Sequence, residues 1–160
     1  MRIGVLSDSH ARSLAELSPK IVERLARMDL ILHAGDYTNW QVVEDLRKLG
    51  PFRGVAGNMD PMTIASELPE RDIVQVQGKR IGLVHGSGGP SGTAQWARRR
   101  FPEDVDAIVY GHSHIAKVEV VEGVLMFNPG SASGRFPARY ASFGILTIDE
   151  EGIRPEIIRV

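Results

Sequence analysis

The sequence predicts a mixed α/β fold in which a parallel β-sheet is followed by antiparallel hairpins. Two patterns support this prediction. Short apolar runs alternate with segments of helical period in the first half of the chain, whereas paired apolar runs flank short turns in the second half. The chain has 160 residues and no cysteine, so we expect one domain over residues 1–160 that needs no disulfide bond.

The first half is predicted to form three parallel strands joined by two helices. Apolar runs at residues 3–6, 30–32 and 52–56 are typical of buried strands. Apolar residues recur every three or four positions over residues 14–28 and 42–49, which indicates amphipathic helices. Because strands alternate with helices, we expect parallel pairing with right-handed crossovers.

The second half is predicted to form three hairpins, with a helix over residues 91–101 and a strand over residues 107–110 between the first two. The paired strands are residues 73–77 with 80–85, 116–121 with 124–128, and 142–148 with 153–160, and their turns are Gly78-Lys79, Glu122-Gly123 and Glu150-Glu151-Gly152.

Charge and hydropathy exclude several classes of partner. The net charge of -1 gives no overall positive field that would attract nucleic acid or an anionic membrane. No stretch approaches the roughly 20 apolar residues of a membrane span, and the first apolar run is too short for a signal peptide. We therefore expect a cytoplasmic protein with no membrane partner. Edge strands of the C-terminal hairpins would allow a homodimer.

Potential metal ligands recur in five short motifs. Asp8-Ser9-His10 and Gly111-His112-Ser113-His114 each hold two donors one residue apart, and in an extended segment such residues project to the same side. Gly35-Asp36, Gly57-Asn58 and His85-Gly86 each place one donor beside a glycine, where the backbone can turn sharply and approach closely. His33 lies between apolar neighbours and is interpreted as a packed strand histidine.

These donors are predicted to converge, because three of the motifs directly follow predicted parallel strands and ligands bind at the carboxyl ends of such strands. Five nitrogen or oxygen donors suffice for one divalent cation, whereas seven that include a bridging carboxylate suit two. Such a pair of cations would seek an anionic oxygen. The seven candidate donors are Asp8, His10, Asp36, Asn58, His85, His112 and His114.

In this order along the chain, the five motifs resemble the signature of calcineurin-like metallophosphoesterases. With Asn128-Pro129-Gly130-Ser131, the sequence is similar to the small, single-domain YfcE-like phosphodiesterases. The resemblance implies a four-layer αββα sandwich, in which two mixed β-sheets are flanked by helices. It also implies that a hydroxide, activated between two divalent metal ions, hydrolyses a small-molecule phosphodiester.

The resemblance also implies roles for individual residues. It assigns Asp36 as the bridge between the ions, with Asp36, Asn58 and His112 at the catalytic centre, and Arg135 is a candidate contact for the substrate. Manganese is the expected metal, and nickel, iron and zinc are also compatible with mixed imidazole and oxygen ligands. One ion would be bound by Asp8, His10, Asp36 and His114, and the other by Asp36, Asn58, His85 and His112.

Met59 departs from the pattern of the family. Many members have histidine directly after the asparagine, where it is proposed to protonate the leaving group, and methionine cannot donate a proton. General acid catalysis is worth about 10²- to 10⁴-fold and matters most for poor leaving groups. We therefore expect a preference for phosphodiesters or activated aryl esters over alkyl phosphomonoesters. The next residue, Asp60, either orients neighbouring groups or forms a turn before Pro61.

Two other functions are compatible with the same fold. A non-catalytic interaction scaffold, such as the retromer subunit of this superfamily, can lose metal ligands freely, whereas this chain keeps all seven. A nuclease would be expected to carry a basic track, and Arg98-Arg99-Arg100 is interpreted as a solvated helix face instead. Trp40 and Trp96 are interpreted as packing residues rather than as platforms for bases.

Overall fold

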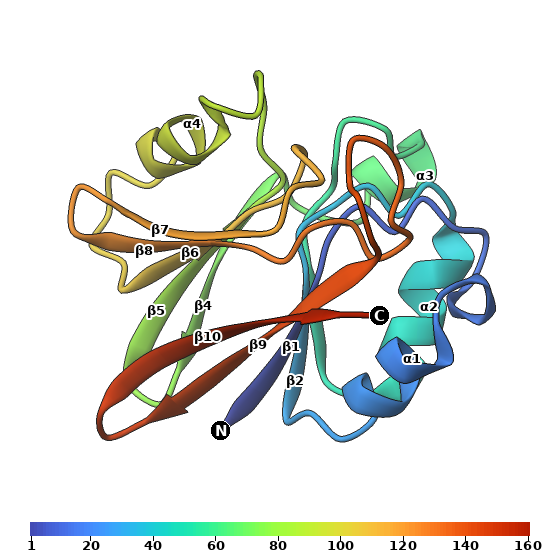
Figure 1. Cartoon of the computed structure of the whole chain (residues 1–160), viewed down its shortest axis with the longest axis horizontal. Helices are drawn as coiled ribbons and strands as arrows, with labels where there is room; N and C mark the ends of the chain where they lie inside the picture. Colours follow the sequence, from blue (N-terminus) through green and yellow to red (C-terminus); the bar gives the residue numbers. More distant parts are fainter.

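Two five-stranded β-sheets pack face to face between helices in the computed structural model, which describes residues 1–160 (Figure 1). In the first sheet, β1, β2 and β3 run parallel, and β9 and β10 extend it by antiparallel pairing. The strand order is β10-β9-β1-β2-β3, with β1 at Arg2–Leu6, β2 at Leu30–His33, β3 at Phe52–Gly54, β9 at Ser142–Asp149 and β10 at Gly152–Arg159.

The second sheet is also mixed. Its three inner strands run parallel, and β4 and β7 pair antiparallel at its two edges. The strand order is β4-β5-β6-β8-β7, with β4 at Arg71–Val76, β5 at Lys79–Val84, β6 at Ala107–Val109, β7 at Lys117–Val121 and β8 at Val124–Asn128.

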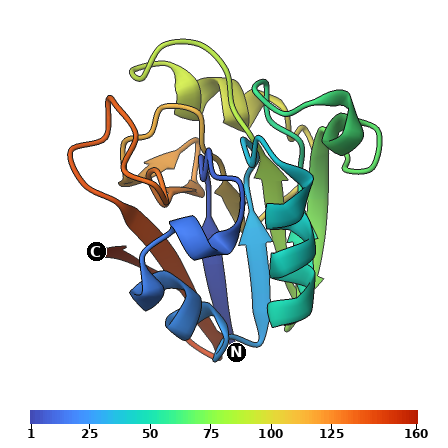
Figure 2. The same ribbon diagram turned by 90° about the vertical axis from the view of Figure 1, so that its right-hand side faces the viewer.

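Helices cover the outer face of each sheet. The helices α1 (Pro19–Leu25) and α2 (Trp40–Leu49) lie across the first sheet, as Figure 2 shows, and α4 (Thr93–Arg99) lies on the second. A 3-10 helix (Leu14–Glu16) precedes α1, and the short helix α3 (Met62–Ala65) follows β3. The predicted four-layer sandwich is therefore confirmed.

Three apolar cores hold these layers together. One lies between α1, α2 and the first sheet, one between the two sheets, and one between α4 and the second sheet. Because β1 and β2 are covered on both faces, nearly all of their residues are buried. This explains why their sequences are continuous apolar runs rather than alternating ones.

The structure corrects two details of the prediction and adds a third. The helix predicted over residues 14–28 is divided, because Pro19 starts α1 and the preceding Ser18 lies outside the helical region. The first hairpin turns at Gln77-Gly78, one residue earlier than predicted, and both residues have positive φ. The third hairpin belongs to the first sheet, where β9 pairs with β1 and removes an exposed edge.

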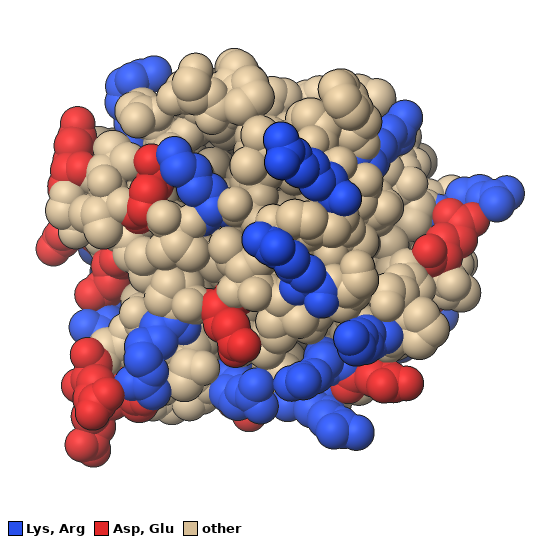
Figure 3. All heavy atoms as spheres, viewed as in Figure 1, with Lys and Arg blue, Asp and Glu red and all other residues tan.

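The surface carries charges of both signs. On the face drawn in Figure 3, lysine and arginine side chains are spread widely and acidic side chains stand among them. No helix has the length and apolar character needed to cross a lipid bilayer.

Candidate metal centre

All seven predicted donors lie beyond the carboxyl ends of strands, at one end of the two sheets. Residues as far apart in sequence as His10 and His114 come within hydrogen-bonding distance there. Five loops carry these donors. The loops after β1 and β6 carry two donors each, Asp8 and His10 in the first and His112 and His114 in the second. The loops after β2, β3 and β5 carry one donor each, which are Asp36, Asn58 and His85 in that order.

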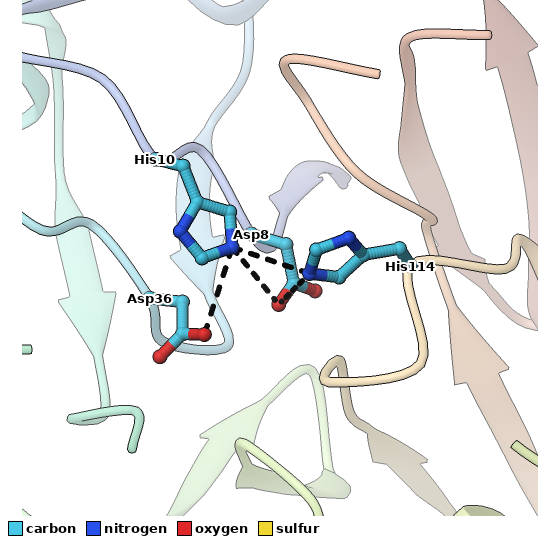
Figure 4. A group of neighbouring side chains, drawn as sticks. All are labelled: Asp8, His10, Asp36 and His114. Atoms are coloured by element: carbon cyan, nitrogen blue, oxygen red, sulfur yellow. Dashed lines mark hydrogen bonds and ion pairs between the residues drawn. The ribbon is translucent and has the colours of Figure 1, made fainter. Parts of the chain in front are cut away.

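Four of these side chains form a compact group, shown in Figure 4. One ligand atom from each of Asp8, His10, Asp36 and His114 lies within 4.8 Å of the others. His10 Nε2 is 3.2 Å from His114 Nε2 and 3.6 Å from Asp36 Oδ2. His114 Nε2 is 3.3 Å from Asp8 Oδ1.

A second group lies on the other side of Asp36. Asn58 Oδ1 is 3.0 Å from His85 Nε2 and 3.1 Å from His112 Nδ1. Asp36 Oδ2 is 3.3 Å from His85 Nε2, so the same oxygen faces both groups. The structure thus brings together all seven residues in the two sets suggested by the resemblance, with Asp36 between them.

Backbone carbonyls fix the orientation of three histidines. His85 Nδ1 donates to the carbonyl oxygen of Ala34 at 2.7 Å, and His114 Nδ1 donates to that of Arg135 at 3.0 Å. His112 Nε2 donates to the carbonyl oxygen of Gly88 at 3.1 Å. A carbonyl can only accept, so in each neutral imidazole the opposite nitrogen keeps a lone pair directed into the centre. Metal-binding histidines show the same arrangement.

Asp8 contributes a buried oxygen with no hydrogen-bond partner, Oδ1. Its other oxygen accepts from Ser7 Oγ at 2.5 Å and from the backbone N–H of His112 at 3.0 Å. A buried carboxylate oxygen without a partner is costly unless a cation neutralises it. The donor set of imidazole, carboxylate and amide oxygen fits first-row divalent metals.

The carboxylates also draw positive charge toward the histidines. The carboxylate of Asp8, whose Oδ1 lies 3.3 Å from His114 Nε2, raises the pKa of His114. Burial lowers the pKa of His85, but Asp36 and Asp8 outweigh this effect and raise it. Burial would raise the pKa of Asp36, yet the hydrogen bond from His85 holds it below its usual value. The centre therefore favours a bound cation.

Strained backbone is concentrated at these ligands. Asp8, His10 and Asp36 have φ values of 52°, 43° and 60°, and His112 and His114 have values of 71° and 59°. The prediction that the paired donors project from extended segments is therefore wrong. Left-handed turns aim them at the centre instead. Such conformations cost on the order of 1–3 kcal/mol each and cluster at functional sites.

Glycine permits the close approach of two of these loops. A Cβ at Gly35 would lie 2.8 Å from the backbone of Gly57 and 2.9 Å from His85 Nδ1. A Cβ at Gly57 would collide with the side chain and backbone of Asp36. The glycines of the motifs thus make room for the ligands, as predicted.

Asp60 fastens the same two loops together. Its carboxylate accepts from the backbone N–H groups of Asp36 at 3.0 Å, Thr38 at 2.8 Å and Gly57 at 2.8 Å. Of the two alternatives for Asp60, the structure shows the orienting one. Burial raises the pKa of Asp60, and the three N–H donors oppose that rise.

His33 and Arg135 lie outside this group of donors. His33 is fully buried, stacks on Tyr37 and bonds to Ser9 Oγ at 2.5 Å, which confirms its packing role. The side chain of Arg135 is exposed at the rim, beside the carbonyl group that holds His114. Burial is the main effect that lowers the pKa of His10, and the charge of Arg135 adds to it.

Comparison with known proteins identifies the family. A family model described as a calcineurin-like phosphoesterase superfamily domain matches residues 1–151. The chain belongs to this family. The membership inferred from five sequence motifs is confirmed, and it supports phosphoester hydrolysis of a small-molecule substrate at a metal site.

Several known proteins match along nearly the whole chain. A probable metallophosphoesterase of Methanothermobacter thermautotrophicus is 35% identical over 162 residues, covering 99% of this chain and 92% of that protein. The solution structure of a Thermotoga maritima protein has 32% identity and a TM-score of 0.78, with 99% of each chain covered. The crystal structure of Entamoeba histolytica Vps29 complexed with zinc has 26% identity, a TM-score of 0.74 and the same coverage.

Proposed function

We propose that this protein is a metal-dependent phosphodiesterase whose centre binds two divalent ions. The observation that carries the proposal is the position of Asn58 Oδ1, which lies 3.1 Å from His112 Nδ1 and 3.0 Å from His85 Nε2. Since Nε2 of His112 donates to a carbonyl group and burial lowers the pKa of this histidine, a hydrogen bond from the neutral imidazole cannot account for its contact with Asn58. A cation accounts for it.

The second proposed ion would lie among the four ligand atoms of Figure 4. Asp36 would bridge, because its Oδ2 faces a histidine of each group. Manganese is the proposed metal, with nickel, iron and zinc as alternatives for the same ligands. The zinc complex of the similar Entamoeba histolytica Vps29 supports a site of this kind.

The residues of the chain would act by position and charge. Divalent ions held by these residues would supply positive charge to the phosphoryl oxygens and would lower the pKa of a water. The backbone N–H of Met59 donates to Asp36 Oδ1 at 2.8 Å and leaves Oδ2 directed into the centre. The loop carbonyl of Gly88 keeps His112 against Asn58. Exposed Arg135 would attract an anionic diester to the rim.

The preference for diesters rests on the position after Asn58. Met59 is 56% exposed and offers no proton. The neighbouring Asp60 is committed to three backbone N–H groups as an acceptor. Neither side chain can protonate a poor leaving group, so the proposed substrates are phosphodiesters and esters with good leaving groups.

Hydrolysis of bis(p-nitrophenyl) phosphate with added Mn²⁺ tests the proposal. We expect turnover that a chelator abolishes, and an Asp36→Asn variant that is slower by at least about 100-fold, since even outer partners of metal ligands cost 10- to 100-fold. Asp104→Asn is the matched control, because Asp104 is exposed and lies outside the centre. Full activity with chelator, or in the Asp36→Asn variant, would refute the proposal.

A second candidate function is a metal-binding interaction scaffold. The similarity to Vps29 favours it, since that protein has this fold with a TM-score of 0.74 and is named for vacuolar protein sorting rather than for hydrolysis. Metal analysis combined with a panel of phosphate esters distinguishes the two functions. A protein that binds stoichiometric metal and hydrolyses no ester would be a scaffold.

A further inference from the structure

A cavity of about 430 Å³ adjoins the metal centre and has no role in the function described so far. Asn58 and His85 belong to its wall, so it opens directly onto the proposed ligands. Other parts of the wall come from Trp96 in α4 and Arg100 directly after it, and from Ala65 and Glu70 in the segment between β3 and β4. Its volume lies within the range of small-molecule pockets, roughly 300–1,000 Å³.

Trp96 gives this cavity an aromatic wall. The indole packs against the apolar core beneath α4, yet it is only partly buried and lines the cavity. The guanidinium of Arg100 lies over its ring at 5.4 Å from the centroid. The packing role predicted for Trp96 is therefore correct but incomplete, because packing also holds the ring in place beside the centre.

Arg100 supplies the positive charge of the cavity. Its guanidinium lies 3.8 Å from Glu70, whose side chain is 91% exposed. Exposed ion pairs at such distances are weak, so Glu70 leaves Arg100 free to contact a ligand. The cation thus lies over the aromatic surface within one cavity that shares two residues with the centre, and a ligand ring that stacks on Trp96 would move the guanidinium aside.

We propose that this cavity binds an aromatic ester group of the substrate, stacked on Trp96, with Arg100 contacting an anionic substituent of the ring. The inference rests on the proposed function, since it requires the phosphoryl group at the metal centre. Stacking of a base on an aromatic side chain is worth about 1–3 kcal/mol, or roughly 5- to 150-fold in affinity. An aryl or nucleosidyl diester would gain this binding, and a dialkyl ester would not.

Fluorescence of Trp96 tests the proposal without turnover. A Trp40→Phe background leaves Trp96 as the sole tryptophan, since the chain has two. The zinc-loaded protein is titrated with phenylphosphonate and with methylphosphonate. We expect phenylphosphonate to quench the emission and to bind at least about 5-fold more tightly. Equal affinities, or binding of neither compound, would overturn the proposal.

Variants of the cavity wall supply the second arm. The two phosphonates are compared as inhibitors of diester hydrolysis. The Trp96→Leu variant should lose the preference for phenylphosphonate over methylphosphonate, and the Trp96→Phe variant should keep part of it. Arg100→Met should weaken the binding of 4-carboxyphenylphosphonate more than the binding of phenylphosphonate. Arg99→Met is the control, because Arg99 is exposed on the same helix and does not line the cavity. A preference that survives in Trp96→Leu would overturn the proposal.

The two arms separate this inference from the proposed function. If diesters are hydrolysed but the two phosphonates inhibit equally, only the aromatic subsite fails. If no ester is hydrolysed and phenylphosphonate still quenches Trp96 selectively, the proposed phosphodiesterase activity fails and the subsite stands.

Discussion

Asn58 Oδ1 lies 3.1 Å from His112 Nδ1, although His112 already directs its other nitrogen to the carbonyl oxygen of Gly88. In the neutral imidazole, two lone pairs therefore face each other. Two acceptors without a hydrogen between them repel, and the folded chain must hold them in place. A cation held by Asn58 and His112 would relieve this repulsion, so metal binding should be coupled to stability.

We expect divalent metal to stabilise the folded protein. Binding that is confined to the folded state contributes about 2.7 kcal/mol at a ligand concentration 100 times the dissociation constant. Mn²⁺ or Zn²⁺ should therefore raise the unfolding temperature, and a chelator should reverse the rise. Differential scanning fluorimetry measures this directly. The rise should be smaller in Asp36→Asn and unchanged in Asp104→Asn, and an unaltered unfolding temperature in the native protein would contradict the coupling.

Replacement of Asp60 should loosen two loops at once. Asp60→Asn exchanges an acceptor-only carboxylate for an amide whose NH₂ group faces backbone N–H donors. Loss of hydrogen bonds to a charged group, with donors left unsatisfied, should cost about 2–4 kcal/mol. Urea unfolding measures the loss, and a metal titration should show weaker binding. Asp104→Asn is again the control, and native metal affinity in Asp60→Asn would show that Asp60 does not position the ligands.

Local patterns explain why much of this site could be predicted. A glycine beside a donor is visible in the sequence, and the structure shows that Gly35 and Gly57 let their loops touch. Apolar runs located the strands β1 and β2, so the donors that follow them were expected at one edge. Both features depend on residues next to each other in the chain.

Features that depend on distant contacts could not be predicted. Asp8 and His10 adopt left-handed conformations that non-glycine residues avoid without tertiary support, and that support includes backbone bonds to the loop after β2. The pairing of β9 with β1 joins the two ends of the chain, and no local pattern encodes it. In contrast, Pro19 was a readable helix start within the segment predicted as one helix.

His33 should make the protein less stable in acid. Burial lowers its folded pKa to about 3, from 6.5 in its ordinary state. Below pH 6.5 the unfolded chain therefore binds a proton that the folded chain refuses, and stability falls by about 1.4 kcal/mol per pH unit until the folded pKa is reached. Above pH 6.5 this effect vanishes.

His33→Gln isolates this contribution, because glutamine can form hydrogen bonds with the N–H of Gly35 and the hydroxyl of Ser9 but does not titrate. The native protein's advantage over the variant in free energy of unfolding should shrink by about 2 kcal/mol between pH 6.5 and pH 5.0. Urea unfolding of the metal-free proteins at several pH values measures it. Parallel pH profiles would show that His33 is protonated in the folded state.

Met59→His should widen the range of substrates. The side chain at this position is largely exposed, and its backbone N–H already holds Asp36, so the exchange should leave the fold and the centre intact. A histidine there can protonate a leaving group, and such help is worth about 10²- to 10⁴-fold. We expect kcat for an alkyl phosphomonoester to rise by at least about 10-fold, while hydrolysis of bis(p-nitrophenyl) phosphate changes little because its leaving group needs no proton. Met59→Gln, which is polar but cannot act as an acid, is the control. Equal gains on both substrates would mean that this position affects binding rather than proton transfer.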